Sequence, residues 1–199
     1  MKILLLIVSC IVSSSAFALE NKIIKDCEDC HGKNGISFES DVPTIAGASA
    51  AFMEATLFTY QDNTRPVIES KYRTGDTSRA TTDMKKIADQ LTDQQISDLS
   101  EHYASLPFVP AKQSFDATLV TTGKKIHERK CRKCHEDGGS SAEDDAGILA
   151  GQWTPYLQES MKHFRDGSRE TDKKMKKLID KLNEEEWSAL LAFYASQQD

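Results

Sequence analysis

Apolar side chains recur three and four positions apart along this chain, a spacing that places them on one face of a helix. Two such faces lie in the first half and two in the second: Met84, Ile87 and Leu91; Ile96, Leu99 and Tyr103; Met175, Leu178 and Leu182; Trp187, Leu190 and Tyr194. No segment alternates apolar and polar residues over a useful length, so no strand is expected. The pattern predicts an all-α protein.

Further helices are predicted where similar patterns are bounded by start signals. Their ranges are 22–31, 50–61, 119–135 and 155–165. Thr154 is the expected cap of the last of these, with Pro155 at its first helical position. Two other caps each have a partner three residues on, Thr92 with Gln95 and Asn183 with Glu186, which predicts a capping box at each closing helix.

The same arrangement occurs twice in the chain. Sliding the sequence by 104 positions superimposes many residues up to Arg65 and Arg169, and sliding it by 91 superimposes the closing segments, so the first copy has a 13-residue insertion between Pro66 and Asp83. We therefore expect two small domains, at 19–106 and 119–199, joined by a linker at 107–118. Each is too small to bury more than a modest core of its own.

The first 18 residues have the pattern of a secretory signal peptide. Lys2 precedes an apolar run from Ile3 to Val12, and 16–18 fit a small-residue cleavage site. The run is too short to span a bilayer, and no other window is apolar enough, so no membrane span is expected. A lipoprotein anchor at Cys10 is a minor alternative. Cleavage after residue 18 would remove Cys10 and deliver the chain to the periplasm.

Every remaining cysteine belongs to a C-x-x-C-H motif. Cys27, Cys30 and His31 form the first, and Cys131, Cys134 and His135 form the second. This is the attachment signature of c-type haem, in which two thiols bond to the porphyrin and the adjacent imidazole binds the iron. The sequence predicts two covalently bound haem c groups, one for each domain.

Other uses of these cysteines fit the spacing less well. A zinc site would need its second cysteine pair about 15 to 20 residues after the first, whereas roughly a hundred intervene here. A thioredoxin-like dithiol would need an alternation of strands and helices that is absent from this sequence. Disulfide bonds would not explain why a histidine directly follows the second cysteine of each motif.

The sixth position on each iron decides the chemistry, because an open position binds oxygen and a filled one favours electron transfer. Only Met84 and Met175 superimpose on each other in the repeat, whereas Met53 and Met161 superimpose on leucines. We expect Met84 to complete the first site and Met175 the second, although both could also be core residues. No histidine outside the motifs is common to both copies, which disfavours a second imidazole.

Three further residues are candidates for support of the haem sites. The carbonyl of Pro43 could accept a hydrogen bond from the His31 ring and orient it. Gly147 occupies the equivalent position of the second copy, so the contact need not be repeated there. Arg65 and Arg169 could pair with haem propionates, or could be exposed loop residues.

The charge of the chain makes some partners less favourable. The formal net charge is −6, and the acidic excess lies mostly in the first half. This argues against nucleic acid or an anionic membrane as the main partner. Basic residues instead surround the second motif and Met175. They suggest different docking partners for the two haems or a difference in potential between them, and a solvated face is the alternative.

Together the two motifs and the paired methionines resemble tandem class I cytochrome c domains, as in cytochrome c4. A second resemblance, to the cytochrome subunit of flavocytochrome c sulfide dehydrogenase, is carried by residues 110–116, 131–135, 138–139, 148–158 and 192–198. It implies a non-catalytic subunit that takes electrons from an FAD-containing flavoprotein and passes them to a soluble cytochrome c. The first domain fits this second family less well than the second domain does.

Three functions therefore remain in view. The second resemblance favours the periplasmic subunit of a sulfide-oxidising complex. The alternatives are a free cytochrome c4-like carrier to a terminal oxidase, and a dihaem enzyme such as a peroxidase or a thiosulfate dehydrogenase, which would need one haem with an open or labile axial site.

Overall fold

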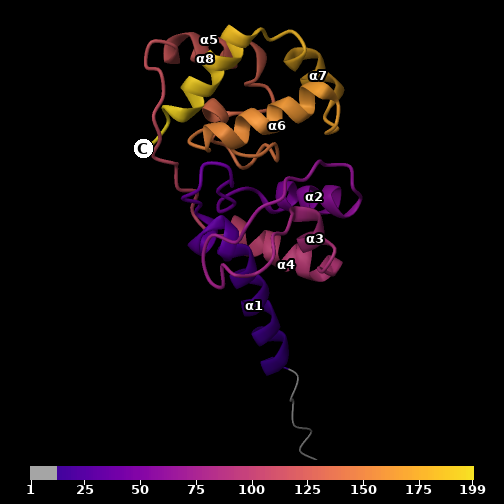
Figure 1. Ribbon diagram of the computed structural model, residues 1–199. Helices are drawn as coiled ribbons and strands as arrows, with labels where there is room; N and C mark the ends of the chain where they lie inside the picture. The colour runs from indigo at the N-terminus through magenta and orange to yellow at the C-terminus, as the bar shows by residue number, and fades with distance from the viewer. Residues whose placement is uncertain (1–12) are drawn as a thin grey trace, which may run out of the picture.

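The computed structural model describes residues 13–199 and is built from helices in two stacked domains (Figure 1). The first contains α1 (Ser13–His31), α2 (Ala50–Gln61), α3 (Met84–Ala88) and α4 (Asp93–Ala104). The second contains α5 (Val120–Lys130), α6 (Thr154–Asp166), α7 (Lys173–Ile179) and α8 (Glu184–Ala195). Two short 3₁₀ turns, η1 (Lys33–Gly35) and η2 (Asp137–Gly139), occupy equivalent places. The predicted all-α class is confirmed.

Between residues 13 and 199 the only β pairing is an isolated bridge of Ser70 with Thr82. No helix of this part of the chain is both long and apolar enough to cross a membrane. The expected signal peptide falls largely on residues 1–12, which lie outside the described residues, and Cys10 lies there too.

The predicted capping boxes are present at both closing helices. Thr92 accepts from the backbone N–H of Gln95 at the start of α4, and the Gln95 side chain accepts in return from Thr92 N. Asn183 and Glu186 do the same at the start of α8. Each box satisfies two backbone donors that the first helical turn leaves unpaired, so the local sequence fixes where these helices begin.

Three other boundaries differ from the sequence prediction. The helix expected at 22–31 begins earlier, at Ser13. The helix expected at 119–135 ends at Lys130, because His127 O accepts from the N–H groups of both Cys131 and Arg132, which breaks the i to i−4 ladder. Thr154 is inside α6 and does not cap it. The N–H of Thr154, which has no partner within the helix, donates to the Gln113 side chain at 2.9 Å. The linker thereby supplies the cap.

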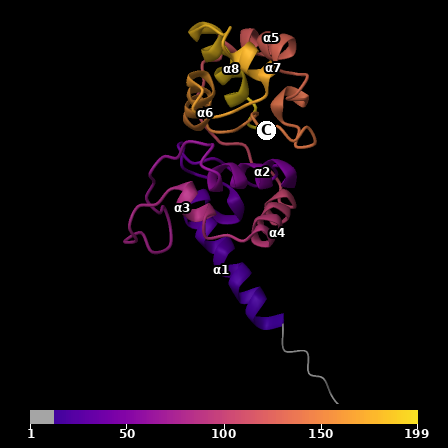
Figure 2. The ribbon, with the colours of Figure 1, turned by 90° about the vertical axis from the view of Figure 1, so that its right-hand side faces the viewer.

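The core of the second domain is the crossing of α5 and α8 (Figure 2). A Cβ at Gly123 would lie 1.9 Å from the carbonyl oxygen of Ala189, so only glycine lets the two backbones approach this closely. Buried residues at the crossing include Ile126, Leu190 and Tyr194. The first domain packs Met53, Leu99 and Tyr103 against the last turns of α1.

The segment between α4 and α5 contacts both domains. Ala111 N donates to Gly151 O at 2.7 Å, and a Cβ at Gly47 would overlap Phe108.

One hydrogen bond is repeated in the two copies, from Gly47 N to Tyr103 O and from Gly151 N to Tyr194 O, each 2.9 Å long. In each domain the loop that follows the C-x-x-C-H motif is thus hydrogen-bonded to the closing helix at the same place.

Candidate haem sites

The first motif occupies the last turns of α1. Cys27 and Cys30 are one helical turn apart, so both thiols lie on the same side of the helix, and His31 is its last residue. Gly32 then turns the chain away with a φ of 80°, a conformation that glycine adopts without strain. The His31 ring is buried. One helix end therefore positions all three groups.

The second bond of the His31 ring is made to the backbone. Its Nδ1 lies 2.9 Å from the carbonyl oxygen of Pro43, which leaves Nε2 for another ligand. Burial lowers the pKa of His31 below its usual value, so the ring is held neutral, as a metal ligand must be.

The second motif lies in the turns that follow α5. Cys131 is partly buried, Cys134 is exposed and the ring of His135 is buried. Here Gly147 replaces Pro43, and Nδ1 of His135 is buried without a hydrogen-bond partner. The two histidines are therefore equally buried but held differently.

Cys27, Cys30 and Cys131 do not have the properties of redox or metal-binding cysteines. The four cysteines of residues 13–199 are free. Burial raises the pKa of the Cys27 thiol to about 12, and it also raises the pKa values of Cys30 and Cys131. Buried thiols of this kind are protonated and unreactive, unlike the low-pKa thiols of dithiol oxidoreductases. In the described part, no three His, Cys, Asp or Glu side chains are grouped to hold a bare metal ion.

Met84 and Met175 occupy corresponding short helices. Met84 is the first residue of α3, whose cap Asp83 accepts from Lys86 N at 2.9 Å. Met175 lies in the first turn of α7, and the hydroxyl of Thr171 donates to its sulfur at 3.0 Å. Both side chains are partly exposed. Their role as iron ligands stays a prediction.

Arg65 is a buried residue at the boundary of the domains. Its guanidinium lies over the ring of Tyr60 and donates from Nη2 to the Tyr156 hydroxyl of the other domain, at 3.2 Å. The Nη1 atom is buried and has no partner. Burial, with the charge of Arg65 as the next cause, lowers the pKa of Arg169 to about 10. The positive charges of Arg65 and Arg169, which lie over the rings of Tyr60 and Phe164, make this region favourable for binding an anion.

The residues present fit a covalently attached haem. Two free thiols stand beside each buried neutral imidazole, Nδ1 of His31 is engaged so that its Nε2 remains for iron, and Arg65 has an unsatisfied buried donor where a propionate would supply the missing acceptor.

The insertion of the first copy covers its motif, which sequence reasoning did not anticipate. Asp29, inside the motif, is buried and pairs with Arg79. Its carbonyl accepts from the N–H groups of Arg73 and Thr74, at 2.8 and 3.0 Å. The carboxylate of Asp29 is therefore neutralised within the chain.

The sequence disfavoured His127 as an iron ligand but did not show that it is buried beside the second motif. His127 in α5 is fully buried, and its Nδ1 lies 3.0 Å from the hydroxyl of Tyr194, while Nε2 has no partner. Ile23 stands at the equivalent position of the first copy, so this arrangement belongs to the second domain alone.

We expect His127 to make stability depend on pH. Burial lowers its pKa, so below pH about 6.5 the unfolded chain takes up a proton that the folded chain does not. The free energy of unfolding should fall as the pH drops from 6.5, with a slope of up to about 1.4 kcal/mol per pH unit from this residue. Denaturant unfolding at pH 7 and pH 5 measures it.

His127→Ile should remove this part of the slope, whatever it does to stability at neutral pH. His102→Phe, at a partly exposed histidine, is the matched control for replacing a histidine by an apolar residue. An unchanged slope in His127→Ile would contradict the prediction.

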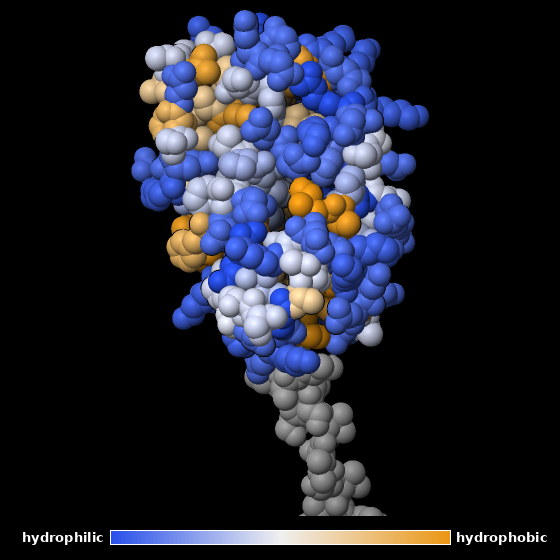
Figure 3. Space-filling model, in the orientation of Figure 1, coloured by the Kyte–Doolittle hydropathy of each residue, from blue (hydrophilic) through white to orange (hydrophobic). Residues whose placement is uncertain are grey.

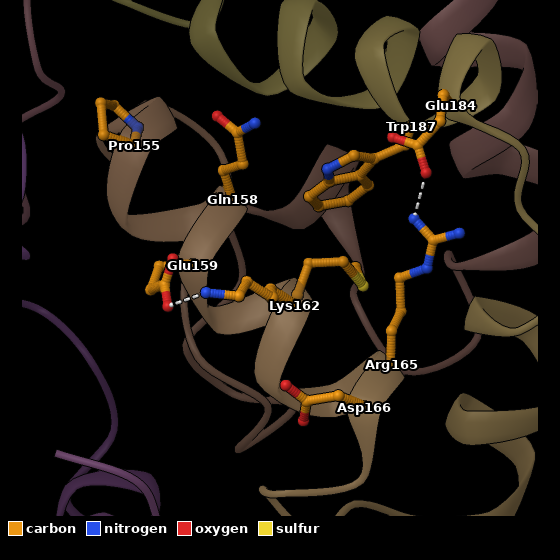
Figure 4. A pocket seen from close by; sticks show the side chains of 9 residues that line it. Pro155, Gln158, Glu159, Lys162, Arg165, Asp166, Glu184 and Trp187 are labelled. Carbon is orange, nitrogen blue, oxygen red and sulfur yellow. Dashed lines mark hydrogen bonds and ion pairs between the residues drawn. The ribbon is translucent and has the colours of Figure 1, made fainter.

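The hollow drawn in Figure 4 lies on the outer side of α6, where α8 begins. Lys162 pairs with Glu159 and Arg165 pairs with Glu184 along its walls, and Trp187 forms its floor. None of its lining residues belongs to a C-x-x-C-H motif or is one of the two candidate methionines. It has no part in the haem sites.

Two family models match the chain, one over each domain. Residues 21–107 match the model described as cytochrome c, and residues 118–193 match that of cytochrome c oxidase, cbb3-type, subunit III.

Similar proteins and structures agree with these matches. Cytochrome c-554(548) of Halomonas halodenitrificans is 30% identical over 93 residues, which are 47% of this chain and 98% of that protein. Cytochrome c4 of Thiocapsa roseopersicina is 26% identical over 156 residues, 73% of this chain and 72% of that protein. The crystal structure of reduced cytochrome c4 from Pseudomonas stutzeri has a TM-score of 0.71 at 22% identity, covering 92% of this chain and 98% of that one. The last likeness is one of fold.

Proposed function

We propose that this chain, which belongs to the cytochrome c family, is a free-standing dihaem electron carrier like cytochrome c4. It has two tandem cytochrome c domains and carries two covalently bound haem c groups. The observation that carries the proposal is that both domains place a complete motif at a buried, neutral histidine. When bound, each haem supplies one-electron exchange at its iron.

The residues of the chain have distinct tasks in this proposal. Cys27 and Cys30 hold the first haem and Cys131 and Cys134 the second. His31 with Met84, and His135 with Met175, fill the axial positions, so that no position remains for oxygen. Arg65 and Arg169 hold propionates at the boundary of the domains, where the unsatisfied Nη1 of Arg65 is buried.

Two differences between the sites favour reduction of the second haem before the first. Pro43 accepts a hydrogen bond from His31, which strengthens that imidazole as a donor to iron, whereas Nδ1 of His135 has no acceptor. Thr171 donates to the sulfur of Met175, which draws electron density from it, and the residue four positions before Met84 is Ala80, which has no hydroxyl. A weaker donor favours ferrous iron.

The structure also bears on the choice between a free carrier and a flavoprotein subunit. Within the resemblance to flavocytochrome c sulfide dehydrogenase, the segment 148–158 carries Gln152, Trp153 and Tyr156, whose side chains bond to the first domain. This segment thus has a use inside the chain and does not require a flavoprotein. The face shown in Figure 3 is mostly hydrophilic with small separate apolar areas, as suits a protein that meets its partners transiently.

Charge indicates where such a partner would dock. Lys133, Lys173, Lys174 and Lys177 are exposed around the second motif and Met175. An acidic protein surface would be attracted to this end, and salt would screen the attraction.

We place the protein in the periplasm, because residues 1–18 have the pattern of a secretory signal peptide.

Purification from the native host tests the proposal. We expect a flavin-free protein with two covalent haems, which exchanges electrons with a soluble cytochrome c or an oxidase and does not bind carbon monoxide when reduced. Recovery in a stable complex with an FAD protein would restore the sulfide dehydrogenase subunit. Rapid carbon monoxide binding at one haem would indicate a dihaem enzyme.

A further inference from the structure

One peptide unit of the first domain is hydrogen-bonded on both sides. Its carbonyl, that of Pro43, lies 2.9 Å from Nδ1 of His31, and its N–H, that of Thr44, donates to Oε1 of Gln152 at 3.0 Å. The two groups share one planar, conjugated amide. A continuous line of hydrogen bonds therefore runs from a haem-binding histidine of one domain to a glutamine of the other.

The Gln152 side chain is fixed in a single orientation. Its Nε2 donates to the carbonyl oxygen of Thr44 at 2.9 Å, so its amide pairs with both backbone groups of one residue. Its Oε1 also accepts from the N–H of Trp153 at 3.1 Å. Gln152 and Thr44 are 4% and 6% exposed, so water does not compete for these bonds. An apolar side chain of similar size would provide none of them.

The backbone of Gln152 is held as firmly as its side chain. Gln113 of the linker donates from Nε2 to Gln152 O at 2.8 Å, while its Oε1 accepts from Thr154 N. The indole N–H of Trp153 donates to Ser37 O at 3.1 Å, which is a third hydrogen bond from this segment to the first domain. Hydrogen bonds thereby hold the segment 152–154 against both the first domain and the linker.

We propose that Gln152 is a positioning residue that sets the donor strength of His31 from the other domain. The inference rests on the proposed function, in which His31 binds the iron of the first haem. Donation by Thr44 N–H to Gln152 polarises the amide and makes the Pro43 oxygen a stronger acceptor. A stronger acceptor increases the basicity of the imidazole, which stabilises ferric iron and lowers the potential of the first haem.

The second domain has no counterpart of this line. Ala48 stands where the repeat would place a glutamine, and Gly147 stands in place of Pro43. The ring of Phe52 packs against Gly147, where a Cβ would lie 2.6 Å from it, and Nδ1 of His135 is unpaired. The potential of the second haem should therefore be independent of Gln152.

Gln152→Met and Gln152→Leu in the haem-loaded protein test the inference, because each keeps an apolar side chain in the buried space. We expect the midpoint potential of the first haem to rise and that of the second to stay unchanged. The ring N–H of His31 should also exchange faster with solvent, which proton NMR of the reduced protein measures.

Trp153→Phe is the matched control, because it removes the bond to Ser37 across the same boundary and leaves the Pro43–Thr44 amide paired. We expect it to leave both potentials in place. Equal shifts in Trp153→Phe and Gln152→Met would mean that loosening of the interface is the cause, and would overturn the inference. So would an unchanged first potential in folded variants with both haems attached. Absence of covalent haem or of histidine–methionine ligation in the unmodified protein would instead overturn the proposed function.

Discussion

Met84→His should lower the potential of the first haem by a few tenths of a volt, a part of the roughly 0.8 V range that axial ligands span. The thioether favours ferrous iron, and a second imidazole favours ferric iron. Met175→His should do the same at the second haem only. Redox titration followed by visible absorption resolves the two transitions.

Alanine at the same positions gives an independent result. Met84→Ala or Met175→Ala should open one axial position, so that carbon monoxide binds rapidly to one haem of the reduced chain. Met53→Leu and Met161→Leu are the matched controls, because the repeat places leucine opposite each of them. Unchanged potentials in both histidine variants would show that other residues bind the irons.

Replacing both cysteines of one motif by serine should halve the covalent haem content, from two per chain to one. The thioether bonds need both thiols, and a haem held only by its histidine is lost on denaturation. Mass spectrometry of the denatured chain counts the attached haems. Two haems remaining after Cys131→Ser with Cys134→Ser would contradict the assignment of the motif.

The two domains should respond differently to this loss. The buried cluster of the first domain has four residues, and that of the second has nine, centred on the crossing of α5 with α8. The first domain therefore depends more on the haem as core material. Cys27→Ser with Cys30→Ser should remove the helical signal of α1–α4, whereas the second pair should leave α5 and α8 associated. Circular dichroism with limited proteolysis distinguishes these outcomes.

Much of the fold could be predicted because the controlling interactions are local. The helix at 50–61 has the predicted bounds, and the capping boxes at Thr92 and Asn183 are formed by residues three positions apart. The haem motifs are equally local, since their five positions need no distant partner. The sequence predicted that α5 ends at residue 135, whereas it ends at Lys130, because the periodicity does not show that His127 O accepts two N–H groups.

The sequence by itself determined that this is an all-α protein with two covalent haem sites, because helix periodicity, capping and the C-x-x-C-H spacing are properties of short segments. Only the tertiary structure decided how the domains act on each other. Arg65 donates to Tyr156 of the second domain, and Gln152 pairs with Thr44, 108 positions away. Such contacts depend on how two folded surfaces meet, which no spacing along the chain encodes.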